Sequence, residues 1–165
     1  MAGAEYAGMA MRNVLRRKQI SLQARGNRRY VSPGTSLGLR PAETKAMIDE
    51  ILAGFSFRTL EIFSSESNLA VAEIASLIEV PQRTLARRKV AGRLSSEESE
   101  RLLRLSRIFE KAVALFEGNV EAAVAWLRKP KRALGDKSPL AYSRTEVGAR
   151  QVEELIGALE QGVFA

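Results

Sequence analysis

Residues 71–90 read VAEIASLIEVPQRTLARRKV, and this stretch decides the fold class. Its apolar spacing predicts two short helices, over 70–78 and 82–90, joined by a turn of about three residues next to Pro81. Such a pair is typical of a helix-turn-helix, although an αα-hairpin that merely packs has the same outline. Five small or apolar residues are expected to hold the two helices together: Ile74, Ala75, Ile78, Val80 and Leu85.

The second of these helices carries side chains that suit DNA. Gln can bond both groups on an adenine edge, Arg can do the same with guanine, and Thr, Lys and further Arg suit phosphates or thymine methyls. Residues 81–93 hold five basic residues and no acidic one, whereas residues 41–80 hold two basic and seven acidic ones. We therefore predict a cationic DNA-binding face, with an ordinary solvated helix face as the alternative. The candidate DNA-binding residues are Gln82, Arg83, Thr84, Arg87, Arg88, Lys89 and Arg93.

Glu79 stands in the turn, at a place where helix-turn-helix proteins often carry Gly. A left-handed backbone conformation at a residue with a Cβ atom costs about 1 kcal/mol. The turn is therefore expected either to keep that conformation at this cost or to differ slightly from the usual one.

The composition excludes several classes of protein. The chain has 165 residues, of which 45% are hydrophobic and 27% charged, which indicates one ordinary soluble domain or two small ones. Cysteine and histidine are both absent, so disulfides, thiolate nucleophiles, imidazole bases and Cys/His metal sites are excluded. No apolar run is long enough for a membrane span. We predict a binding protein rather than an enzyme, with no cofactor, no metal and no membrane partner.

The excess of positive charge lies at the start of the chain. The formal net charge is +7, and residues 1–40 alone hold eight basic residues against one acidic residue. Glycine and proline punctuate residues 26–40, which is typical of a linker. We predict a basic, flexible N-terminal arm over residues 1–40. It either adds nonspecific affinity for DNA or has no functional consequence.

The remainder of the chain predicts an all-α fold, because its apolar residues recur at helical spacing throughout. A helix over 42–52 is expected to end at Gly54, and a short helix is expected near 57–65. Ser95 and Glu98 have the spacing of a capping box. They predict the start of a long helix of roughly 30 Å that joins two subdomains.

The C-terminal part is expected to contain two more helices. Gly118 ends the long helix and Asn119 caps the next one, which runs up to Pro130. Residues 129–142 are expected to be loop. Ser143 and Glu146 repeat the capping-box spacing and predict a last helix that closes near Gly162. We place a helix-turn-helix domain, including the long helix, at 41–117 and a C-terminal domain at 118–165.

From about Phe57 to Ala165, the sequence resembles the Xre/MbcA/ParS antitoxins of bacterial toxin–antitoxin pairs, especially those paired with RES-domain toxins. Residues 88–102, RKVAGRLSSEESERL, carry part of the resemblance. The chain departs from the family pattern at Lys131, Asp136, Ala141 and Tyr142. The more specific part is an ordered C-terminal set: Trp126, Leu127, Pro130, Leu134, Gly135, Pro139, Leu140, Thr145, Gly148, Ala149, Arg150, Val152, Leu155, Ile156, Leu159, Gly162, Val163 and Phe164.

The resemblance implies a cytoplasmic bacterial antitoxin, with an Xre-like helix-turn-helix that binds the operator of its own operon and a small helical domain that binds a toxin. RES toxins degrade NAD, a related branch modifies proteins with ADP-ribose, and in this family the antitoxin's C-terminal end reaches into the toxin's active-site cleft. The implied partners are a cognate RES-domain toxin and operator DNA, and we expect a homodimer because operators are usually read by symmetric dimers. The candidate toxin-binding residues are Pro130, Gly135, Pro139, Gly148, Arg150, Glu153, Glu154, Leu159, Gly162, Val163, Phe164 and Ala165.

Ordinary folding roles are the alternative for members of the C-terminal set. We prefer such roles for Trp126, Leu127, Leu134 and Leu155. For Gly162, Val163 and Phe164 we prefer toxin contact, because a solvated chain end has no need of apolar residues. There, Gly162 permits a tight turn and the two apolar residues with the terminal carboxylate form a compact plug, which suits a phosphate-binding cleft. An alternative function is a free-standing transcription regulator whose C-terminal helices dimerise or bind an effector.

Overall fold

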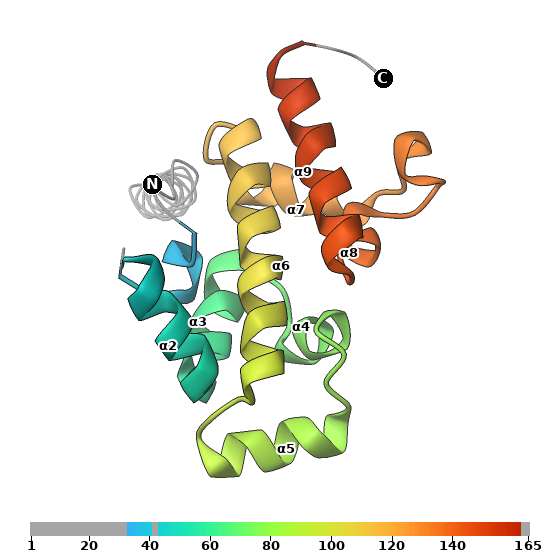
Figure 1. Ribbon diagram of the computed structural model, residues 1–165. Helices are drawn as coiled ribbons and strands as arrows, with labels where there is room; N and C mark the ends of the chain where they lie inside the picture. The colour runs from blue at the N-terminus through green and yellow to red at the C-terminus, as the bar shows by residue number, and fades with distance from the viewer. Residues whose placement is uncertain (1–32, 41–42, 163–165) are drawn as a thin grey trace, which may run out of the picture.

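The structure is a computed structural model that describes residues 33–40 and 43–162. These residues form helices joined by turns and short connections (Figure 1), which confirms the predicted all-α class. The elements are η1 (Thr35–Leu37), α2 (Thr44–Ala53), α3 (Phe57–Ser67), α4 (Val71–Leu77), α5 (Gln82–Ala91), α6 (Ser96–Leu115), α7 (Val120–Arg128), η2 (Arg132–Leu134), α8 (Pro139–Tyr142) and α9 (Glu146–Glu160).

The long helix α6 is the central element of the fold. Helices α2 and α3 pack against it on one side and α7 and α9 on the other, while α5 crosses beneath its first turn (Figure 1). The predicted capping box is confirmed, because the Ser95 hydroxyl accepts from the Glu98 amide at 3.2 Å and the Glu98 carboxylate accepts from the Ser95 amide at 2.8 Å. Phe109 of α6 meets Phe63 edge to face, with 5.4 Å between ring centroids. Both rings are fully buried in one continuous core.

Two predicted helix ends are confirmed. Helix α2 ends at Gly54, which has a φ of 81°. A Cβ atom at this position would lie 2.2 Å from the Leu94 carbonyl oxygen, so both the backbone conformation and the close approach require glycine. The side chain of Asn119 caps α7 by accepting from the Ala122 amide at 3.0 Å.

Residues 129–142 are not the plain loop that the sequence predicts. They contain η2 and the single-turn helix α8. Pro139 occupies the first position of α8, where its missing N–H is no loss, and the Ser138 hydroxyl caps the helix by accepting from the Ala141 amide. Leu134 and Leu140 anchor the segment in the core.

The predicted capping box of Ser143 and Glu146 is wrong. Helix α9 is capped by Thr145, whose hydroxyl accepts from the Gly148 amide at 3.1 Å. Ser143 is instead the C-terminal cap of α8, is buried, and donates its hydroxyl to the Leu140 carbonyl oxygen. Ser143 and Thr145 can both cap a helix, but Ser143 already ends α8, so Thr145 caps α9.

The predicted N-terminal arm is too long at its carboxyl end, because residues 33–40 pack against α3 and α6. The buried Glu110 carboxylate accepts hydrogen bonds from the Ser36 amide at 2.8 Å, the Ser36 hydroxyl at 2.6 Å and the Gly34 amide at 3.2 Å. Burial raises the pKa of Glu110 above its ordinary value, although these three hydrogen bonds favour its charged form. Leu37 is fully buried beside this contact. The remainder of the predicted arm, residues 1–32, lies outside the described residues.

Candidate functional site

Helices α4 and α5 form the predicted helix-turn-helix. The residues that were expected to join them are all buried: Ile74, Ala75, Ile78, Val80 and Leu85. The turn is closed by a hydrogen bond of 2.8 Å from the Val80 amide to the Ala75 carbonyl oxygen. Buried contacts therefore fix the angle at which α5 leaves the turn.

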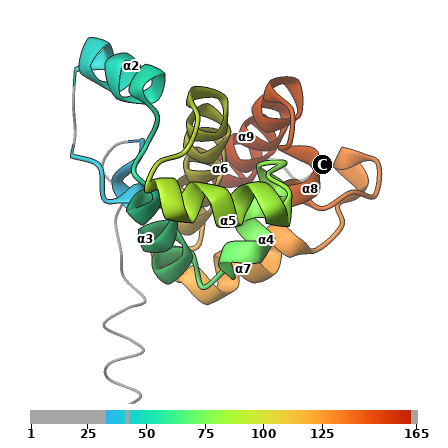
Figure 2. The ribbon, with the colours of Figure 1, turned by 90° about the horizontal axis from the view of Figure 1, so that it is seen from below.

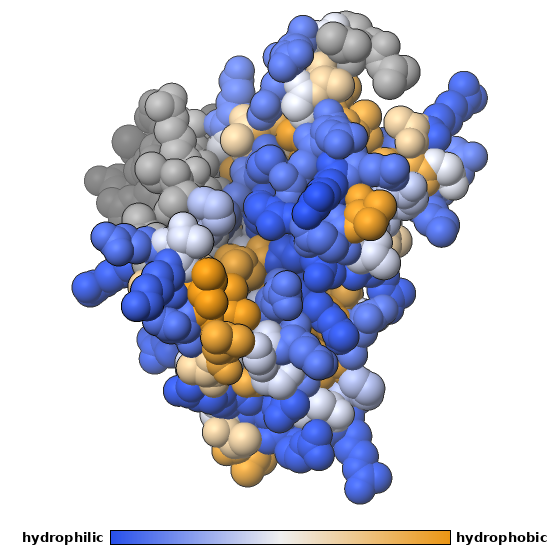
Figure 3. Space-filling view, in the orientation of Figure 1, coloured by the Kyte–Doolittle hydropathy of each residue, from blue (hydrophilic) through white to orange (hydrophobic). Residues whose placement is uncertain are grey.

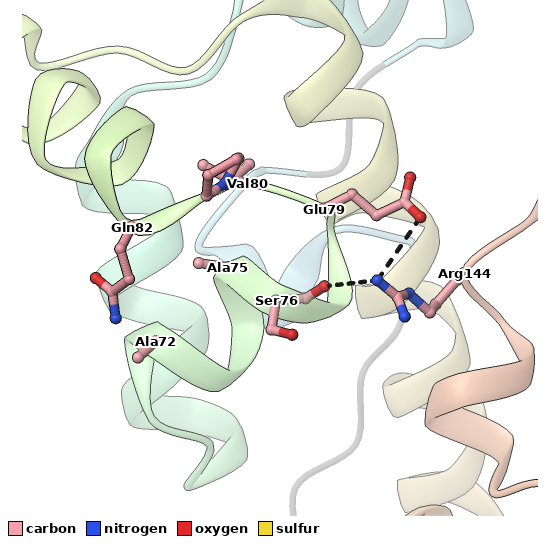
Figure 4. A pocket seen from close by; sticks show the side chains of 8 residues that line it. Ala72, Ala75, Ser76, Glu79, Val80, Gln82 and Arg144 are labelled. Carbon is pink, nitrogen blue, oxygen red and sulfur yellow. Dashed lines mark hydrogen bonds and ion pairs between the residues drawn. The ribbon is translucent and has the colours of Figure 1, made fainter.

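Glu79 keeps the left-handed conformation of the turn, with a φ of 59°. Its carboxylate lies 3.9 Å from a guanidinium nitrogen of Arg101 in α6 and 3.7 Å from one of Arg144, which precedes α9. Arg144 also donates to the Ser76 carbonyl oxygen. Ser76, Glu79 and Arg144 border a shallow groove beside α4 (Figure 4). All three charged side chains are substantially exposed, so each pair offsets only a small part of the conformational cost.

The outer face of α5 is cationic and open to solvent. Gln82, Arg83, Arg87 and Lys89 are exposed, and none of these three cations forms an ion pair with another residue that the structure describes. Thr84 is half-buried beside them. Seen from below, α5 runs across the front of the molecule, ahead of the other described helices (Figure 2). A helix presented in this way can enter the major groove of DNA.

Arg88 differs from its neighbours on α5. Its Nε atom donates to both oxygens of Glu98, at 3.1 and 2.8 Å, and the Glu98 side chain is only 9% exposed. Because the same carboxylate caps α6, this contact ties α5 to the start of α6. The structure thus gives Arg88 a role in positioning α5, which competes with its predicted contact to DNA.

Arg93, the last predicted DNA-binding residue, follows α5. It is exposed and donates to the Ala53 carbonyl oxygen at 2.9 Å. A bridge between Ser56 and Arg93, with a hydrogen bond from the Leu94 amide to the Phe55 carbonyl oxygen, holds this connection against the end of α2. Arg93 therefore follows the cationic face of α5, but one of its guanidinium nitrogens is already bonded to a backbone carbonyl oxygen.

Ion pairs join α9 to α6. Glu153 accepts from Arg107 and, at 2.7 Å, from Lys111, and Glu146 at the start of α9 accepts from Arg104 at 3.0 Å. Burial raises the pKa of both carboxyl groups, but the surrounding cations outweigh it and lower the pKa of each below its ordinary value. We call this set of contacts the α6–α9 seam. Glu153, predicted to bind toxin, is part of it.

Two other predicted toxin-binding residues are buried within the fold. A Cβ atom on Gly148 would lie 1.9 Å from the Tyr142 carbonyl oxygen, so α8 and α9 can approach only at a glycine. Pro139 is buried at the start of α8. Both residues pack inside the C-terminal domain and are not exposed at its surface.

The other predicted toxin-binding residues lie on the outside. Leu159 is half-buried, and Gly162 follows α9 with a φ of 72°. Residues 163–165 lie outside the described residues. The exposed members of the set, apart from Gly162, are Pro130, Gly135, Arg150 and Glu154.

Sequence reasoning missed the contacts between the helix-turn-helix and the C-terminal helices. Arg128, at the end of α7, donates to both oxygens of Glu73 in α4, at 3.2 and 2.7 Å. Together with Arg144, it fastens α4 to the C-terminal half. The partners are separated by 55 residues, so no local pattern could reveal them.

Within the described part of the chain, no group of His, Cys, Asp and Glu side chains could hold a metal ion. Among the same residues, no helix is both long and apolar enough to span a bilayer.

Fold and site together define a helix-turn-helix protein with an appended helical domain. Residues 46–107 match the family model of the antitoxin Xre-like helix-turn-helix domain, and residues 111–162 match that of the antitoxin Xre/MbcA/ParS C-terminal toxin-binding domain. The gap between the two matched ranges lies inside α6. The chain is similar to "Antitoxin Xre" of Yersinia enterocolitica, with 38% identity over 130 residues that cover 78% of this chain and 88% of the relative.

Two further relatives have the same description. "Antitoxin Xre" of Photorhabdus laumondii is 30% identical over 127 residues, covering 76% of this chain and 86% of the relative. "Antitoxin Xre" of Pseudomonas putida is 36% identical over 84 residues, covering 50% of this chain and 52% of the relative. The chain belongs to the Xre/MbcA/ParS family of antitoxins, and it combines a helix-turn-helix with a toxin-binding domain. It is not an enzyme.

Proposed function

We propose that this antitoxin neutralises a cognate RES-type, NAD-degrading toxin by occluding its active site with the C-terminal end, and that it represses its own operon as a homodimer through α5. The observation that carries the proposal is the placement of the two surfaces. Helix α5 lies beneath the first turn of α6, and α9 ends beyond the other end of α6 (Figure 1). DNA and toxin can therefore be held at the same time without competing for one surface.

The DNA-binding part of the proposal is supported by the exposed cations of α5. Arg83, Arg87 and Lys89 form no ion pair with the part of the chain that the structure describes and can contact phosphates or guanine. Gln82 stands at the N-terminal end of the helix, where base contacts are usually made. The buried contacts of Leu85 and the Arg88–Glu98 pair hold the helix rigidly. Ordering costs on binding are therefore small.

The toxin-binding part is supported by the end of α9. The seam with α6 holds this helix in place, and Gly162 turns the chain off the helix axis through its left-handed conformation. The sequence that follows, Val163 to Ala165, is apolar. Such a segment suits the part of a cleft that holds the rings of NAD.

The homodimer is supported by an apolar surface on α2. Ile48 is 49% exposed and Leu52 68% exposed, on a helix in which no residue is buried. Apolar surface lies over this helix in Figure 3. A second copy of the chain would cover this face in a symmetric contact, and a twofold dimer would place two α5 helices against a palindromic operator.

Co-expression tests the proposal. The open reading frame next to this gene is induced alone and together with the antitoxin, while growth and cellular NAD are measured. We expect the neighbouring protein alone to arrest growth and deplete NAD, and the antitoxin to restore both. Growth arrest without loss of NAD would contradict a RES-type toxin, and the absence of any toxic neighbour would contradict neutralisation.

A further inference from the structure

The segment between α7 and α8 carries the most concentrated positive charge of the C-terminal domain. Residues 129–137 hold four basic residues and one acidic residue: Lys129, Lys131, Arg132, Lys137 and Asp136. We call this segment the basic hairpin. It projects from the side of the molecule at the right of Figure 1, and hydrophilic side chains extend from this region in Figure 3.

The cations of the hairpin differ from the others nearby in having no acidic partner among the described residues. Between residues 94 and 162, every basic residue outside the hairpin forms an ion pair, and no basic residue inside it forms one with the part of the chain that the structure describes. The paired residues are Arg101, Arg104, Arg107, Lys111, Arg128, Arg144 and Arg150.

The hairpin holds these charges in fixed positions. The Lys131 amide donates to the Lys137 carbonyl oxygen at 3.0 Å, and the Asp136 amide donates to the Lys131 carbonyl oxygen at 3.0 Å. The buried side chain of Leu134 anchors the tip. The Lys131 ammonium lies 4.8 Å from the centre of the Trp126 ring. The backbone that carries the charges is therefore set before any partner binds.

Burial and a like charge nearby both disfavour the charged form of Lys131 in the free protein. Burial, and then repulsion from Lys129, lowers the pKa of Lys131 below its ordinary value. An acidic surface placed against the hairpin would relieve this repulsion. A rigid group of unpaired cations is the arrangement that speeds association with an oppositely charged partner.

We propose that the basic hairpin docks on an acidic patch of the toxin's surface, outside the toxin's active site. The inference rests on the proposed function. The hairpin belongs to the toxin-binding domain and lies in the same half of the molecule as the end of α9, whereas α5 lies at the opposite end of α6 (Figure 1). DNA bound to α5 would thus be remote from the hairpin. The toxin is the occupant that the placement favours.

The test compares two variants that remove the same charge from different surfaces. One carries Lys129→Gln, Arg132→Gln and Lys137→Gln in the hairpin. The matched control carries Arg83→Gln, Arg87→Gln and Lys89→Gln in α5. None of the six residues forms an ion pair with any other described residue, so both variants are expected to unfold at the temperature of the unmodified chain. Association rates with the purified toxin and affinities for operator DNA are measured at low and high ionic strength.

We expect the hairpin variant to associate with the toxin about tenfold more slowly at low ionic strength, with a flattened salt dependence and unchanged affinity for DNA. The α5 variant should show the reverse pattern. An unchanged association rate in the hairpin variant would overturn the inference, as would a loss of DNA affinity in its place. If the unmodified chain binds no toxin at all, the proposed function fails as well, and the unmodified control distinguishes the two failures.

Discussion

Helix α5 and the α6–α9 seam are both rich in arginine and lysine, but their cations differ in whether they form ion pairs within the protein. Arg83, Arg87 and Lys89 of α5 are exposed and have no ion-pair partner among the described residues, whereas Arg107 and Lys111 of α6 are bound to Glu153. The acid that pairs with α6 comes 42 to 46 residues later in the chain. Whether a cation is available for a ligand is thus decided by tertiary partners rather than by local charge density. The following predictions test this contrast, starting with the largest effect.

Gly148→Ala tests how tightly the C-terminal helices are packed. The added Cβ atom would overlap the Tyr142 carbonyl oxygen, and we expect the free energy of unfolding to fall by about 3 kcal/mol or more. Gly157→Ala is the matched control, because it lies in the same helix with open space around it and should be neutral or slightly stabilising. Denaturant unfolding of both variants measures the difference. Equal stability would show that Gly148 is not needed for packing and would restore toxin contact as its main role.

Arg88→Ala and Arg87→Ala separate the two kinds of cation within one helix. Loss of Arg88 leaves the mostly buried Glu98 carboxylate without its partner, and we expect a destabilisation of about 2 kcal/mol. Loss of Arg87 should change stability by less than about 0.5 kcal/mol while weakening operator binding and its salt dependence. Thermal unfolding and salt titrations of DNA binding measure both properties. The contrast fails if the two variants lose stability equally.

Glu153→Gln tests the seam through pH. The pKa of Glu153 is lowered in the folded protein, so the unfolded chain takes up a proton at a higher pH than the folded chain. The stability contributed by this carboxylate is therefore present above pH 4.5, the ordinary value of a glutamate, and is lost as the pH falls through the folded-state pKa. We expect the variant to be less stable by about 1 kcal/mol at neutral pH and to lose less stability on acidification. Parallel pH profiles for both proteins would argue against the seam.

The sequence predicts those features that local patterns determine. The helix-turn-helix core, from Ile74 to Leu85, follows from apolar spacing, and the capping box at Ser95 and Glu98 follows from residues three positions apart. The same pattern was misleading at Ser143, because Thr145 offers a second cap two positions later and α8 uses the first. Local spacing cannot decide between two caps when a neighbouring helix competes for one of them.

Features that depend on distant partners could not be predicted. The sequence assigns residues 33–40 to a flexible arm, yet Glu110, 74 residues beyond Ser36, binds this segment to α6. It also assigns Arg88 to DNA and Glu153 to the toxin, although each is held by an internal partner. The basic hairpin could not be recognised from the sequence either, because its cations are distinguished by forming no ion pair with the described residues, and the sequence does not show which cations are paired.

The most direct test of the division of labour uses two variants in two assays. One variant ends at Gly162, without Val163 to Ala165, and the other carries Arg83→Gln, Arg87→Gln and Lys89→Gln in α5. Growth rescue from the toxin and affinity for operator DNA are measured for both. We expect the shortened chain to lose rescue while binding DNA normally, and the α5 variant to rescue growth while losing DNA affinity. Full rescue by the shortened chain, or loss of both activities in either variant with the fold intact, would contradict the account.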